Sequence, residues 1–75
     1  MERYANRNGN SGVAAYQMGA TSILVQFTTC AVYEYTYASA GAGNIESMKS
    51  LAISGSGLCS FIKRHVNKRY SRKIR

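Results

Sequence analysis

The C-terminal segment of the chain gathers side chains that suit phosphate binding. Ten Lys and Arg against three Asp and Glu give the 75 residues a net charge of +7. Residues 1–62 sum to zero, so the whole excess lies in residues 63–75, which contain no acid. Clustered cations neutralise phosphates and release counterions, which is the sequence-independent part of nucleic-acid binding. The candidate nucleic-acid-binding cations are Lys63, Arg64, Lys68, Arg69, Arg72, Lys73 and Arg75.

Three tyrosines at alternating positions, Tyr33, Tyr35 and Tyr37, form a second candidate contact surface. Alternate residues of a strand face the same side, and exposed aromatic rings stack on nucleobases. Tyr33 and Tyr35 are therefore candidate base-stacking residues. The competing interpretation places at least two of the three tyrosines wholly or partly in the core, because so small a domain needs its aromatic rings there.

Catalytic and metal-binding chemistry finds little support in the residue types. The chain has one histidine, His65, and three glutamates that lie far apart in sequence. Cys30 and Cys59 match no zinc-ligand spacing with that histidine, and no glycine-rich phosphate loop precedes a helix with a lysine. We therefore predict a non-enzymatic protein with no metal and no cofactor. Two reduced cysteines are the favoured state, with a bridge between them as the alternative.

Export and membrane insertion also lack a signal. Residues 1–7 have no apolar segment of the kind that a signal peptide requires. Residues 8–33 carry no charge, but polar residues and glycines interrupt them too often for a membrane span. The sequence therefore predicts a cytoplasmic protein with no membrane contact.

Hydrophobic patterning indicates the elements that position the candidate residues. Period-two alternation and β-branched or aromatic residues predict strands over about 13–18, 22–28 and 31–37. A helix is expected over about 45–53, with Asn44 as its N-cap and Gly55 in the break that ends it. We therefore predict an α+β fold in which an antiparallel sheet of two or three strands is followed by two helices that cover one face.

The second predicted helix, over about 58–70, is amphipathic. Its apolar arc holds Leu58, Cys59, Phe61, Ile62, Val66 and Tyr70, and the opposite face holds Lys63, Arg64, Asn67 and Lys68. Arg69 falls inside the apolar arc, so either its charge lies near the C-terminal carbonyls or a ligand fixes it.

The predicted organisation of the chain is a polar tail over 1–12, a single domain over 13–70 and a basic tail over 71–75.

The length of the hairpin loop after Phe27 decides which face of the sheet carries the tyrosines. A loop of two or four residues pairs Phe27 with Val32 and puts the tyrosines opposite the Phe27 face. A three-residue loop over 28–30 pairs Phe27 with Ala31 and puts the tyrosines on that same face. Three-residue loops favour a glycine in the left-handed position, and none is present, which favours the first arrangement.

The order of these features resembles that of the KTSC domain, a module found at the C-terminus of some lysyl-tRNA synthetases and as stand-alone bacterial proteins. The likeness spans roughly residues 11–74. The chain departs from the family pattern in three ways. It has Thr29-Cys30 where the family has glycine, and it contains no proline. Lys63 and Asn67 stand where the family has an Asn and an Arg. The features that carry the likeness are a strand ending near Tyr16, a strand closing on Phe27, the Tyr33-Glu34-Tyr35 motif, a short helix, a Ser/Gly break over 54–57, and then Phe61-Ile62, Val66 and Tyr70.

Two hypotheses for function follow. The first is a small module that binds RNA or another nucleic acid through the basic helix face and tail, with tyrosine stacking; the resemblance implies RNA. The second is a protein-interaction or assembly module, either a homodimer or a binder of an acidic protein, that contacts no nucleic acid. Charge alone does not choose between an RNA and an acidic protein partner.

Overall fold

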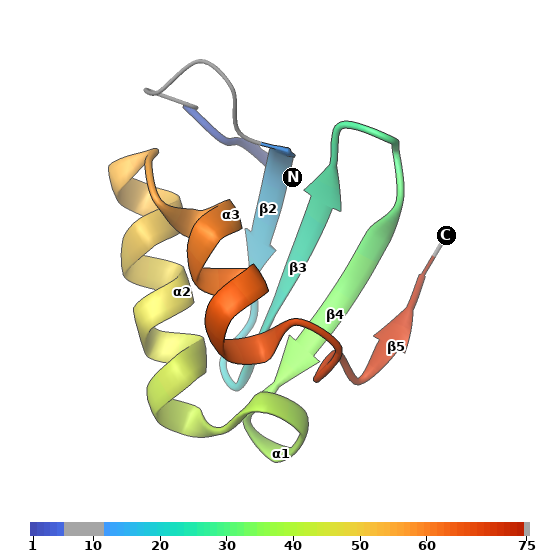
Figure 1. Cartoon of the computed structure of the whole chain (residues 1–75), viewed down its shortest axis with the longest axis vertical. Coiled ribbons are helices and arrows are strands. Elements are labelled where there is room, and N and C mark those ends of the chain that lie inside the picture. The colour runs from blue at the N-terminus through green and yellow to red at the C-terminus, as the bar shows by residue number, and fades with distance from the viewer. Residues whose placement is uncertain (6–11, 75) are drawn as a thin grey trace.

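The computed structural model describes residues 1–5 and 12–74, which form one antiparallel sheet with helices on one of its faces (Figure 1). The predicted α+β class with an antiparallel sheet is confirmed, but the prediction of two or three strands is wrong. The strands, in spatial order, are β1 (Glu2–Arg3), β2 (Val13–Met18), β3 (Ser22–Phe27), β4 (Val32–Thr36) and β5 (Arg72–Lys73). The helices are α1 (Tyr37–Ala40), α2 (Ala42–Ser54), α3 (Leu58–Phe61) and the π-helical turn η1 (Ile62–Val66).

The β3–β4 hairpin turns through the three-residue loop that the sequence disfavoured. Gln26 pairs with Val32, and the Phe27 amide donates to the Ala31 carbonyl at 2.9 Å. Cys30 takes the left-handed position of the loop, with φ 72°, where a glycine was expected. The expected pairing of Phe27 with Val32 is therefore wrong.

This register places the tyrosines on the helix-covered face of the sheet. Tyr33 lies directly opposite Val25, and Tyr35 lies opposite Ile23. Because Ile23 and Val25 are fully buried beneath the helices, their partners point the same way. Tyr35 is 1% exposed and Tyr33 is half-buried, so this pair is shared between the core and its margin.

The first helical segment begins earlier than predicted, because a capping box starts a short helix at Tyr37. Thr36 and Ser39 form a reciprocal capping box at α1, within residues that the sequence assigned to a strand end and a loop. Helix α2 then starts at Ala42, so Asn44 lies inside it and donates to the Ala40 carbonyl rather than capping. Gly55 ends α2 in the left-handed conformation, as the sequence predicted.

The second helical segment is shorter than the predicted 58–70 and ends at Val66. Its last turn is the π turn η1, and Asn67 leaves the helix with φ −26° and ψ −65°. The chain then crosses to the sheet edge, where the Ser71 amide donates to the Glu34 carbonyl. Pairing with the open edge of β4 thus outweighs the helical pattern of residues 67–70.

Both expected tails contribute to the sheet. At the N-terminus, β1 pairs with β2, and Tyr4 is 3% exposed with its hydroxyl accepting from the Leu58 amide at 3.2 Å. At the C-terminus, β5 pairs with β4, so residues 72–73 form an edge strand rather than a tail. The rest of the expected N-terminal tail, residues 6–11, lies outside the described part of the chain.

The core fills the space between the sheet and the helices. Helix α2 contributes Ile45, Met48 and Ala52, each at most 1% exposed, at the i, i+3, i+7 spacing of one helix face. The sheet, α3 and η1 contribute the remaining buried residues, which include Val13, Ile23, Val25, Tyr35, Leu58, Ile62 and Val66.

Candidate functional site

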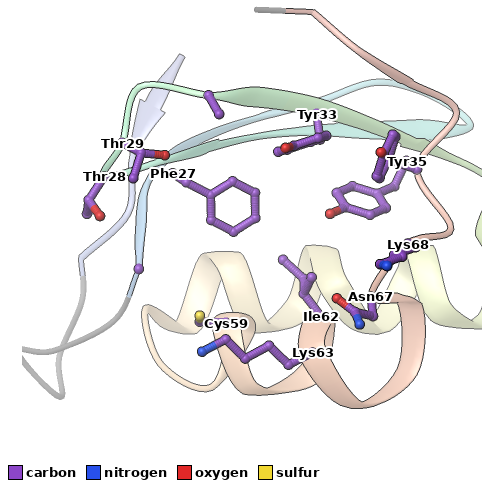
Figure 2. A pocket seen from close by; sticks show the side chains of 13 residues that line it. Phe27, Thr28, Thr29, Tyr33, Tyr35, Cys59, Ile62, Lys63, Asn67 and Lys68 are labelled. Atoms are coloured by element: carbon purple, nitrogen blue, oxygen red, sulfur yellow. The ribbon is translucent and has the colours of Figure 1, made fainter.

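A hollow of ≈ 640 Å³ opens where the β3–β4 hairpin faces the α3–η1 segment. We call it the aromatic cleft. Figure 2 shows the Phe27 ring standing between the sheet and the helix, with Cys59, Ile62 and Lys63 on the helical side. The chain that leaves η1 closes one end of the cleft with Asn67, Lys68 and Tyr70. Thr28, Thr29, Ala31, Tyr33, Tyr35 and Gly12 complete the lining.

Aromatic rings in mutual contact form the sheet side of the cleft. The ring of Phe27 packs edge-to-face on Tyr33, with centroids 5.6 Å apart. Tyr70 lies 4.6 Å from Tyr33 and 6.3 Å from Tyr35, again by ring centroids. Offset and edge-to-face pairs of this kind add about 0.5–1.5 kcal/mol each beyond burial. The cluster therefore holds the rings in fixed positions at the cleft wall.

Burial makes Tyr35 a structural member of this cluster. Desolvation, followed by the neighbouring phenols of Tyr33 and Tyr70, raises the pKa of Tyr35 to about 12. The side chain is 1% exposed, so its ring offers no free face to a ligand. Of the two predicted stacking residues, only Tyr33 is within reach of solvent.

Three lysines lie in the cleft lining or beside one of its rings. Lys63 in η1 and Lys68 beyond it line the cleft directly, and both are exposed. Lys73 pairs with Tyr33 across β4 and β5, and its Nζ lies 5.9 Å from the centre of the Tyr33 ring. Cations at this distance from an aromatic face are weakly attracted to it. These lysines were among the cations predicted from the sequence; the structure places two of them in the lining of the cleft and the third beside one of its rings.

The remaining predicted cations lie elsewhere. Arg64 and Arg69 are exposed and do not line the cleft. Arg69 follows the end of the helix, so it does not lie in the apolar arc where the sequence placed it. Arg72 points to the opposite face of the sheet, where its Nε donates to Glu34 Oε1 at 2.9 Å. Arg75 lies outside the described residues.

The lining residues of the aromatic cleft that the structure describes include no acid. Glu34 lies on the far face of the sheet with Arg72. Glu46 lies on α2, where the Tyr37 hydroxyl donates to it at 2.6 Å; this bond is the main reason why the pKa of Glu46 is lowered and that of Tyr37 raised. The cleft therefore presents uncompensated positive charge over aromatic rings.

A second, smaller hollow provides a contrast. It measures ≈ 460 Å³ and lies between the N-terminus, β2 and the end of α2. Met18 and Ile53 are exposed there, 37% and 68% respectively, and its only charged lining residue among those described is Glu2. It lacks both the ring cluster and the cations of the aromatic cleft.

Sequence reasoning missed three members of the site. Phe27 was placed on a core stripe, Tyr70 on the apolar arc of a longer helix, and Asn67 on that helix's outer face. The π turn and the crossing to β5 bring Asn67 and Tyr70 to the mouth of the cleft. No sequence signal marked that π turn.

The described residues offer no metal centre and no membrane span. Across 1–5 and 12–74, no group of three His, Cys, Asp or Glu side chains is placed to share a metal ion. Within the same ranges, no helix is long and apolar enough to cross a bilayer.

The sequence matches no protein-family profile, and comparison with curated proteins and with solved structures also finds no match. The resemblance to the KTSC domain stays a prediction. The geometry of the aromatic cleft is therefore the main indication of function.

Proposed function

We propose that this chain is a small, non-enzymatic binding module for single-stranded nucleic acid, with RNA as the expected class, and that the aromatic cleft is its contact site. The observation that carries the proposal is the meeting of aromatic rings and lysines at one opening. Lys63 and Lys68 line the same cleft as the rings of Phe27 and Tyr33, and Lys73 lies over the Tyr33 ring. Single-strand binders combine a positive groove with aromatic stacking platforms in this way.

Each component has a distinct task. The lysine ammonium groups contact phosphates, and their contribution falls as salt rises, with a slope of about −0.7 per neutralised phosphate on a single strand. Exposed Arg64 and Arg69 extend the positive surface beyond the cleft. The rings accept bases, and stacking tolerates any base identity because each base has a π face. Such a site binds with little sequence preference.

The concave shape favours single strands over duplexes. Bases in a duplex are stacked and paired, so their faces are unavailable to rings that lie inside a cleft. A duplex can contact only the exposed cations at the rim. Single strands should therefore bind more tightly than duplexes at the same salt concentration.

Fluorescence anisotropy with a labelled oligouridine tests the proposal. We expect micromolar binding at about 0.05 M salt that weakens strongly at about 0.2 M. An unlabelled duplex of equal length should compete less well than the unlabelled single strand, and a polyglutamate peptide of equal charge should compete least. Absence of binding at the lower salt contradicts the proposal. Equal competition by the peptide supports an acidic protein partner instead.

A further inference from the structure

We infer that the aromatic cleft holds one unstacked nucleobase against Phe27 and that this base contributes affinity beyond the charge of the backbone. The inference rests on the proposed function and deepens it, because it names the unit that is recognised. A purely electrostatic binder would respond to phosphates alone. The geometry of the cleft predicts a response to the base as well.

The size of the cleft suits a nucleotide. Its ≈ 640 Å³ lies within the range of about 300–1,000 Å³ typical of sites for small molecules. The hairpin bounds it on one side and the α3–η1 segment on the other, so an inserted base would lie between the two.

Phe27 is the best-placed stacking surface. It is half-buried, lines the cleft and packs against the core, and among the described rings it meets Tyr33 edge-to-face. In Figure 2 its ring is separated from Cys59, Ile62 and Lys63 on the facing helix. Tyr33, in contrast, already has Phe27, Tyr70 and the Lys73 ammonium around it.

Polar groups at the mouth complete a nucleotide site. Both Lys63 and Lys68 line the cleft, and Figure 2 shows the Lys63 ammonium at the Cys59 end and Lys68 at the Tyr35 end, so either can hold the phosphate of the inserted unit. The Asn67 side chain lies near Lys68 and offers both a donor and an acceptor to a base edge. The chemistry of the lining is therefore aromatic inside and cationic outside, as a nucleoside monophosphate requires.

The test compares ligands that differ only in the base. Adenosine 5′-monophosphate and ribose 5-phosphate carry the same phosphate, and their dissociation constants are measured by NMR titration of the backbone amides. We expect the nucleotide to bind about 5- to 100-fold more tightly, which corresponds to one base–aromatic stack. Phe27→Leu, which keeps an apolar side chain but removes the ring, should reduce that ratio to near one and leave the affinity for ribose 5-phosphate unchanged.

A second comparison alters the ligand and uses only the unaltered protein. A fully abasic strand of the same length should bind the unaltered protein more weakly than intact oligouridine, with an unchanged salt slope. Equal affinities for the nucleotide and ribose 5-phosphate overturn the inference, as does a base contribution that survives in well-folded Phe27→Leu. The proposed function then stands or fails separately, on whether oligouridine binds with salt dependence and outcompetes the duplex.

Discussion

Neutralising the two lysines that line the aromatic cleft should weaken single-strand binding by a calculable amount. The perturbation is the double variant Lys63→Gln/Lys68→Gln. Both side chains are exposed, and neither forms a hydrogen bond or ion pair with the part of the chain that the structure describes, so the fold should tolerate the change. If each lysine neutralises one phosphate, the slope of log K against log salt becomes less negative by about 1.4. At about 0.1 M salt, that loss corresponds to roughly 25-fold weaker binding.

The assay is a salt series of anisotropy titrations with labelled oligouridine, and it needs a control of equal charge. Arg3→Glu also lowers the net charge by two, but it changes an exposed residue of β1, at the sheet edge opposite β5. The control should keep most of the affinity and the slope. If Arg3→Glu weakens binding as much as the lysine variant, net charge and not the cleft governs binding, and the reasoning fails. A lower affinity with an unchanged slope would also refute it, because the lysines would then not contact phosphates.

Three further predictions concern stability. Cys30→Gly should stabilise the protein by about 1 kcal/mol in urea unfolding, because glycine occupies the left-handed region without the steric cost that Cys30 carries at φ 72°; Cys30→Ser should give no such gain. Tyr4→Phe should destabilise by about 1–3 kcal/mol, because the buried Leu58 amide loses its acceptor, and a thermal unfolding curve measures the loss. Tyr35 has its pKa raised from 10.0 to about 12, so its contribution to stability is complete below pH 10 and is lost as pH rises toward 12. Unfolding free energies measured across that pH window should fall less steeply in Tyr35→Phe; parallel curves for the two proteins would contradict the assignment.

The central strands and the helix-covered face of the sheet could be predicted because they depend on local patterning. Ile23 and Val25 recur at the period of two within a run of β-branched and apolar residues, and burial of their face against the helices follows from that period. The stop of α2 at Gly55 was predictable for the same kind of reason, since glycine adopts the left-handed conformation at little cost. These features need only a few neighbouring residues to be specified.

The tyrosine face could not be predicted because it depends on one loop residue. A shift of one position in the β3–β4 register would move every β4 side chain to the other face. The rule that favours glycine in the left-handed position pointed to the wrong loop, since Cys30 occupies that position itself. The cost of one strained residue is small compared with burying Tyr35 beside Ile23.

The mouth of the cleft is formed by pairing between β5 and β4, which are far apart in sequence, so no local sequence pattern predicts it. Residues 67–70 carry a helical pattern, yet the chain leaves the helix because the edge of β4 offers backbone partners. That crossing brings Tyr70 to 4.6 Å from Tyr33 and places Lys73 over the same ring. The sequence identified the cations of residues 63–75 only as a group. The fold shows that Arg72 forms an ion pair with Glu34 on the far face of the sheet, whereas Lys63, Lys68 and Lys73 lie on the side of the cleft.

The most direct test of the aromatic cleft as a nucleic-acid site is to map the contact surface by NMR. Backbone amide shifts are recorded while a short oligouridine is added at low salt. We expect the largest amide shift changes at residues that line the cleft, namely Phe27, Ala31, Tyr33, Lys63 and Asn67. The amide shifts of the outer face of α2 and of the Met18–Ile53 hollow should stay unchanged. Changes centred on that second hollow, or spread evenly over the exposed cations without the cleft, would contradict it.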